Sequence, residues 1–85
     1  MTDLEKEFEA AAGEALNLPK KPDQATLLKL YGLYKQAKNG DVSGKKPGFT
    51  DLTGRAKWDA WAELRGTPRD QAMQDYIELV QKLKL

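Results

Sequence analysis

The sequence contains no cysteine and no histidine. Without cysteine, the chain can form no disulfide and offers no thiol nucleophile. Without histidine, it lacks the commonest general base near neutral pH and the commonest metal ligand. Its acidic residues are scattered among lysine and arginine, and their spacing suggests no catalytic carboxylate pair. We therefore expect no catalytic residues, no metal, no cofactor and no enzymatic activity.

An excess of charge of either sign is also lacking, because 14 basic residues face 13 acidic ones and the net charge is +1. A nucleic-acid-binding domain usually carries a clear basic excess, so no nucleic-acid partner is expected. No apolar run reaches the length of a signal segment or a membrane span. The expectation is a cytoplasmic protein without stable membrane insertion, forming one domain over residues 1–85.

What the chain does contain is helical periodicity, since apolar residues recur at intervals of three and four and nowhere alternate with period two. The first predicted helix begins at Thr2, and Glu5 completes a capping box with it. Thr67 is the predicted N-cap of the last helix, with Pro68 in the first helical position. The four predicted helices cover residues 2–16, 24–38, 54–64 and the stretch from 67 onward. The fold class is therefore all-α.

One connection in this pattern is unusually long. Residues 41–53 show no periodicity of their own, and connections of this length in small domains are often functional. Phe49 and Leu52 are its large apolar residues. We expect both side chains to pin the connection to the body of the protein.

The second predicted helix carries an aromatic and basic face. Tyr31, Tyr34, Lys35 and Lys38 are spaced i, i+3, i+4 and i+7, which places them on one side of the helix. Such a face suits a ligand with flat rings and phosphates. Aromatic residues at helical spacing more often belong to a core, however, and the spacing by itself favours that alternative.

The third predicted helix adds a pair of tryptophans and a lysine. Trp58 and Trp61 are expected to pack in the core. Lys57 points away from that face and could meet Lys35 if the two helices flank one groove. Tyr76, on the last helix, is a core residue by default.

Several separated segments resemble, in order, the acyl-CoA-binding protein family. They are residues 30–37 followed by Gly40-Asp41, residues 54–61, and residues 72–77. The resemblance implies a four-helix bundle of up-down-down-up topology with a long overhand loop between the second and third helices. It also implies a monomer that binds medium- to long-chain fatty acyl-CoA thioesters. Such a protein carries and buffers these thioesters for acyl-CoA-using enzymes, without catalysis.

The resemblance also assigns ligand-binding residues by position. They are Tyr31, Gly32, Leu33, Tyr34, Lys35, Lys57 and Tyr76. In the family, Tyr31 flanks the adenine, the lysines and Tyr34 contact phosphates, and Tyr76 contacts the nucleotide end. Leu27 and Leu28 fall near the acyl-chain groove.

Several positions depart from the family pattern, among them Asp23 and Ala25 at the start of the second predicted helix. Leu16 and Thr53 stand where many members carry a basic residue, and Lys38 stands where members usually have a small one. Lys38 could partly restore the missing charge. The departures keep open an alternative, namely a helical interaction module that retains the fold but binds no ligand.

Overall fold

The computed structural model describes residues 2–85, and within this range the chain forms α-helices, a 3₁₀ turn and no strand. The elements are α1 (Asp3–Glu14), the 3₁₀ turn η1 (Ala15–Asn17), α2 (Gln24–Asn39), α3 (Leu52–Ala62) and α4 (Arg69–Leu83). The predicted all-α class is confirmed. None of the helices in residues 2–85 is both long enough and apolar enough to cross a membrane.

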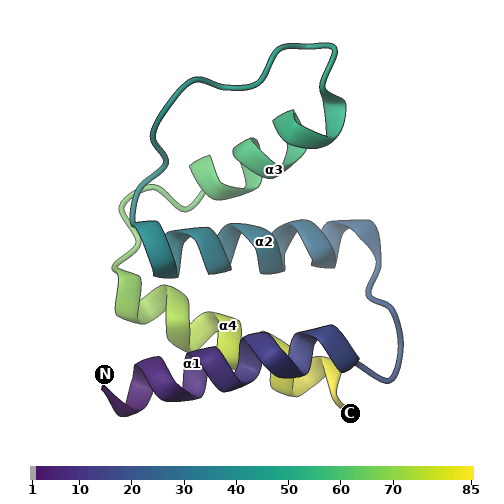
Figure 1. Cartoon of the computed structure of the whole chain (residues 1–85), viewed down its shortest axis with the longest axis vertical. Coiled ribbons are helices and arrows are strands. Elements are labelled where there is room, and N and C mark those ends of the chain that lie inside the picture. The colour runs from purple at the N-terminus through teal and green to yellow at the C-terminus, as the bar shows by residue number, and fades with distance from the viewer. Residues whose placement is uncertain (1) are drawn as a thin grey trace.

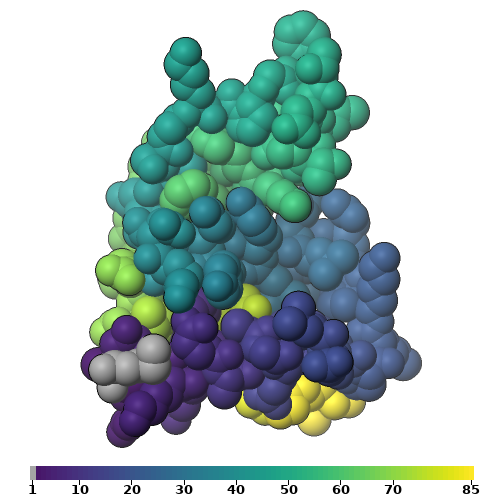
Figure 2. Space-filling model, in the orientation of Figure 1, coloured from purple at the N-terminus to yellow at the C-terminus, as the bar shows by residue number. Residues whose placement is uncertain are grey.

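The helices follow the up-down-down-up order (Figure 1). α1 and α4 run in one direction, and α2 and α3 run in the other. Because α2 and α3 are parallel, the chain must return along the full length of α3 before that helix begins, which explains the long connection. α2 packs against both α3 and α4, while α1 packs against α4. The molecule is flat, measuring 36 × 29 × 15 Å, and Figure 2 shows one of its broad faces.

The first helix begins as its sequence predicts. The Thr2 hydroxyl accepts a hydrogen bond from the Glu5 backbone N–H, and the Glu5 carboxylate accepts one from the Thr2 N–H, both at 3.1 Å. The predicted start of the last helix is wrong in detail. Pro68 immediately precedes α4, and no side chain caps that helix.

The third helix begins two residues earlier than predicted. The Asp51 carboxylate accepts a hydrogen bond from the Gly54 N–H at 3.0 Å and so caps a helix that starts at Leu52. The expectation that Phe49 and Leu52 pin the connection is also wrong, because 80% of Phe49 and 74% of Leu52 are exposed. Polar contacts hold the connection instead, among them a hydrogen bond from the Arg55 guanidinium to the Pro47 carbonyl at 3.0 Å.

The core lies between α1, α2 and α4. Its buried residues are Phe8, Ala11, Leu30, Leu33, Ala37, Ala72, Met73, Tyr76 and Val80. α3 contributes Trp61, of which 8% is exposed, whereas Trp58 is only half-buried. α3 therefore adds to the side of α2 that the main core leaves open, and Lys35 and Lys57 both lie at the seam between these two helices.

Candidate functional site

Two lysine–aromatic contacts join α2 to α3. The Lys57 ammonium lies over the Tyr31 ring, 5.4 Å from its centroid, and the Lys35 ammonium lies over the Trp61 ring at 4.8 Å. Because the helices are parallel, residues four apart on each helix meet in register, and the contacts form two successive rungs. An exposed cation–π contact contributes only about 0.5–1 kcal/mol, so the exposed Lys57 ammonium can turn toward an anionic ligand at little cost.

Gly32 permits the two helices to approach this closely. A β-carbon at this position would lie 2.6 Å from the Ala60 carbonyl oxygen and 2.9 Å from its carbon. Both atoms belong to the α3 backbone, which cannot move aside as the end of a flexible side chain can. Gly32 and its neighbour Leu33, which is 2% exposed, thus have structural positions within the predicted binding segment.

A second aromatic cluster joins α1, α2 and α4. Phe8 stacks on Tyr34 at a centroid distance of 5.5 Å and forms a T-shaped contact with Tyr76 at 5.1 Å, and the two tyrosine rings lie 6.1 Å apart. Burial raises the pKa of the Tyr76 phenol, and the nearby Tyr34 and Glu9 raise it further. The Tyr76 phenol is therefore protonated near neutral pH, and a protonated phenol can donate a hydrogen bond to a phosphate oxygen.

The lysines differ in whether they form an ion pair with a carboxylate. Within residues 2–85 the paired lysines are Lys38 with Glu9 (2.8 Å), Lys46 with Asp59 (2.9 Å) and Lys84 with Glu14. Neither Lys35 nor Lys57 has a carboxylate partner in this part of the chain. These two ammonium groups are the site's uncompensated cations.

Lys38 stands apart from these two cations. The hydrogen bond and the charge of Glu9 raise the pKa of Lys38 above its ordinary value. This ammonium is engaged between α2 and α1, so it is not an obvious replacement for the basic residues missing at positions 16 and 53.

A polar lock at the end of α2 was not foreseen from the sequence. Gln36 is completely buried, and its amide donates hydrogen bonds to the Asp41 carboxylate (2.9 Å) and to the Thr67 carbonyl (2.8 Å). The same Asp41 oxygen accepts a hydrogen bond from the Gly66 N–H at 2.8 Å. The hydrogen bond from the Gly66 N–H and, to a smaller extent, the one from the Gln36 amide lower the pKa of the Asp41 carboxyl. The sequence held one signal for this contact, because Gln36 lies one helical turn after Leu33 and close to Gly40-Asp41.

The lock also orients one rung of the site. The Trp61 indole donates a hydrogen bond to the Gly40 carbonyl at 2.8 Å, at the point where α2 ends. This bond fixes the plane of the ring over which Lys35 lies. The Gly40 carbonyl thus holds the aromatic surface beside Lys35.

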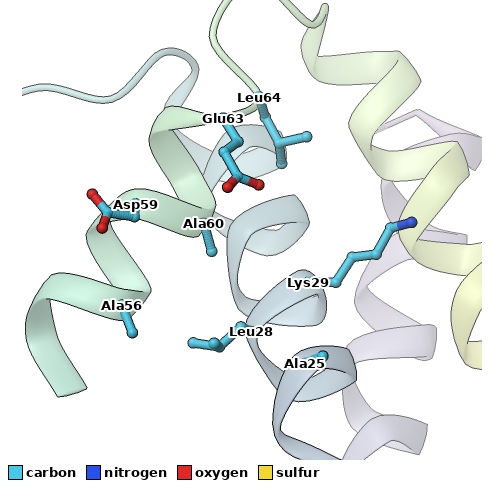
Figure 3. A pocket seen from close by; sticks show the side chains of 8 residues that line it. All are labelled: Ala25, Leu28, Lys29, Ala56, Asp59, Ala60, Glu63 and Leu64. Atoms are coloured by element: carbon cyan, nitrogen blue, oxygen red, sulfur yellow. The ribbon is translucent and has the colours of Figure 1, made fainter. Parts of the chain in front are cut away.

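The two predicted acyl-groove residues occupy different surroundings. Leu28 points from α2 toward α3 and lines a cavity of about 650 Å³ between these helices (Figure 3). Leu27 does not line it and is 37% exposed. The cavity also contains Lys29, which lies about 200° around α2 from Tyr31 at 3.6 residues per turn. None of the predicted nucleotide residues lines the cavity.

Comparison with known proteins assigns the chain to a family. Residues 5–80 match the family model described as acyl CoA binding protein. The chain belongs to the acyl-CoA-binding protein family. This is a family of binding proteins rather than of enzymes.

Members and relatives of the family resemble the chain over most of its length. A protein of Arabidopsis thaliana named acyl-CoA-binding domain-containing protein 6 is 46% identical over 80 residues, covering 94% of this chain and 87% of its own. The crystal structure of Oryza sativa acyl-CoA-binding protein 2 superposes with a TM-score of 0.90 at 45% identity, covering 94% of this chain and 87% of that one. Human enoyl-CoA delta isomerase 2 is 44% identical over 83 residues, which cover 98% of this chain but 21% of that protein.

Against the family pattern, the two departures at basic positions lie on the surface. Leu16 is 84% exposed in η1, and Thr53 is exposed in the first turn of α3. Neither substitution disturbs the core.

Proposed function

We propose that this protein binds medium- to long-chain fatty acyl-CoA thioesters and acts as a cytoplasmic, monomeric carrier and buffer of them. The domain spans residues 1–85, requires no cofactor and catalyses no reaction. Its partners are the acyl-CoA ligand and the enzymes that use it. The observation that carries the proposal is the pair of uncompensated ammonium groups, Lys35 and Lys57, on neighbouring helices beside aromatic rings.

The nucleotide end of the ligand matches this seam. The phosphates of coenzyme A would draw both ammonium groups, since charge-assisted hydrogen bonds are about twice as strong as neutral ones. Tyr31, which is half-buried, offers a ring face for the adenine, and such stacking is worth roughly 1–3 kcal/mol per base. The phenol hydroxyls of Tyr34 and Tyr76 can donate further hydrogen bonds.

The acyl chain requires apolar surface close to the seam. Leu27 is partly exposed one helical turn before Tyr31, and Leu28 follows it toward α3. Each methylene buried there would contribute about 0.8 kcal/mol, so the affinity should rise with chain length. This dependence separates a carrier of acyl thioesters from a site for coenzyme A alone.

Calorimetry with palmitoyl-CoA, octanoyl-CoA, free coenzyme A and palmitate tests the proposal. We expect palmitoyl-CoA to bind most tightly, and both free coenzyme A and palmitate to bind much more weakly. Absence of heat with every acyl-CoA, together with no rise in melting temperature, would instead support the ligand-free interaction module.

The Lys57→Ala variant tests the cation directly. We expect its dissociation constant for palmitoyl-CoA to rise by about tenfold or more, because a hydrogen bond to a charged group is worth roughly 1.5–3 kcal/mol. Lys6→Ala is the matched control, since Lys6 is exposed on α1 and makes no ion pair within residues 2–85. Equal losses in both variants would show that general charge, and not the seam, attracts the ligand.

A further inference from the structure

An ion pair joins α1 to α2 at the edge of the aromatic cluster. The Lys38 ammonium lies 2.8 Å from the Glu9 carboxylate, and 43% of the lysine side chain and 40% of the glutamate side chain are exposed. Of the ion pairs within residues 2–85, this one alone links these two helices. Both charged groups are therefore open to solvent and to a ligand.

The Glu9 carboxylate lies close to the phenols that could meet the phosphates of a ligand. Glu9 follows Phe8, whose ring stacks on Tyr34 at a centroid distance of 5.5 Å. Burial raises the pKa of the Tyr76 phenol, and the charges of Tyr34 and Glu9 raise it further, so this phenol senses the carboxylate. Lys38 lies one helical turn after Tyr34, on the same face of α2. A phosphate that accepts hydrogen bonds from these phenols would therefore come near Glu9.

Lys38 is the cation that compensates this carboxylate. Among residues 2–85, no other ammonium or guanidinium group lies within 4.0 Å of Glu9. Arg69 also carries positive charge near Lys38, but its Nε donates a hydrogen bond to the Ala37 carbonyl at 3.0 Å. Like charges repel one another over about a Debye length, roughly 8 Å at physiological ionic strength. Without Lys38, Glu9 would present an uncompensated negative charge to the phosphates.

We propose that Lys38 is a positioning residue of the acyl-CoA site, which neutralises Glu9 so that this carboxylate does not repel the phosphates of the ligand. The inference rests on the proposed binding of acyl-CoA. It gives Lys38 a role different from that of Lys35 and Lys57, because Lys38 contacts a carboxylate of the protein and not the ligand. An exposed ion pair contributes little to stability, so its loss should change binding far more than unfolding.

Calorimetry with palmitoyl-CoA and variants of the full chain tests this role. Lys38→Ala should raise the dissociation constant by about fivefold, the effect of one uncompensated charge near a protein surface. Adding Glu9→Gln to Lys38→Ala should restore the wild-type value. Adding Glu7→Gln instead gives the same net charge but should not restore it, because Glu7 lies about 200° around α1 from Glu9 at 3.6 residues per turn.

A second ion pair supplies the control for loss of a contact with α1. Lys84 pairs with Glu14, and 39% and 40% of these side chains are exposed, so Lys84→Ala breaks a pair of similar exposure. We expect this variant to bind palmitoyl-CoA as the wild-type protein does. The loss caused by Lys38→Ala should shrink at high salt, which a structural defect would not do. The melting temperatures of Lys38→Ala and of the wild-type protein should be nearly equal.

The results that would overturn the inference can be told from a failure of the proposed function. If the wild-type protein binds and Lys38→Ala binds equally well, the inference alone is overturned. A loss that Glu9→Gln does not restore would overturn it too, because Lys38 would then contact the ligand itself. Equal restoration by Glu7→Gln would show that only the net charge matters. Absence of binding by the wild-type protein would overturn the proposed function and this inference together.

Discussion

Replacing Gly32 by alanine tests how closely α2 and α3 must approach. The added β-carbon would lie 2.6 Å from the Ala60 carbonyl oxygen and 3.3 Å from the Trp61 nitrogen, so the helices must separate by several tenths of an ångström. Overpacking of this kind costs about 1–3 kcal/mol. The better helix propensity of alanine returns about 1 kcal/mol. The expected net change is a loss of up to about 2 kcal/mol in the free energy of unfolding.

Gly13→Ala is the matched control for this experiment. Gly13 also lies within a helix, but a β-carbon there would have no atom within 4 Å. Only the propensity term applies, and Gly13→Ala should therefore raise the free energy of unfolding by up to about 1 kcal/mol. The difference between the two variants isolates the close approach of the helices from the intrinsic preference of alanine.

Urea denaturation followed by tryptophan fluorescence and far-ultraviolet circular dichroism measures both changes. Separating the helices also displaces Lys57 from Tyr31, so Gly32→Ala should weaken palmitoyl-CoA binding, whereas Gly13→Ala should not. If Gly32→Ala stabilised the protein as much as Gly13→Ala, α2 and α3 would have room for the added methyl group, and the structural role given to Gly32 would be refuted.

Two further predictions concern the lock and the aromatic cluster. Hydrogen bonds hold the folded-state pKa of Asp41 below its ordinary value of 3.8. At pH values near and just below 3.8, the folded protein therefore binds fewer protons than the unfolded chain. The stability that Asp41 contributes is present above pH 3.8 and is lost as the pH falls through the folded-state pKa. The Asp41→Asn variant should therefore be less stable than the wild-type protein at neutral pH. Urea titrations should show that this difference in the free energy of unfolding shrinks in acid. A constant difference at all pH values would contradict this reasoning. Phe8→Ala should lower the free energy of unfolding by about 3–5 kcal/mol, because Phe8 is 1% exposed and contacts two aromatic rings. Phe8→Leu should lose less in the same denaturation assay, and equal losses would show that ring contacts contribute little beyond volume.

Local patterns in the sequence were sufficient for much of the fold. The helical periods and the capping box at Thr2 depend on residues within a few positions of one another, and the structure reproduces them. The errors fall where tertiary contacts or loop geometry decide. α3 starts early because Asp51 caps it. Phe49 is exposed, and polar contacts such as the hydrogen bond from Arg55 to the Pro47 carbonyl hold the connection instead.

The candidate site shows the same division between what local spacing predicts and what tertiary contacts decide. The sequence placed Tyr31 and Lys35 on one helix face, since their spacing follows helix geometry, and the family resemblance added Lys57 from a distant segment. Which lysines remain free of carboxylates could not be read from spacing, because Lys38 meets a carboxylate 29 positions away, on α1. An ion pair between residues so far apart in the sequence cannot be predicted from their spacing along the chain.

The sequence by itself determined that this protein has no thiol or imidazole chemistry, that it is helical, and that its second helix carries an aromatic and basic face. Only the tertiary structure decided which parts of that face are available to a ligand. Parallel packing of α2 and α3 across Gly32 brings Lys35 and Lys57 over rings of the opposite helix, while Glu9 engages Lys38. The physical reason is that helical spacing fixes the direction of a side chain around its own axis, whereas its partners depend on how the helices pack.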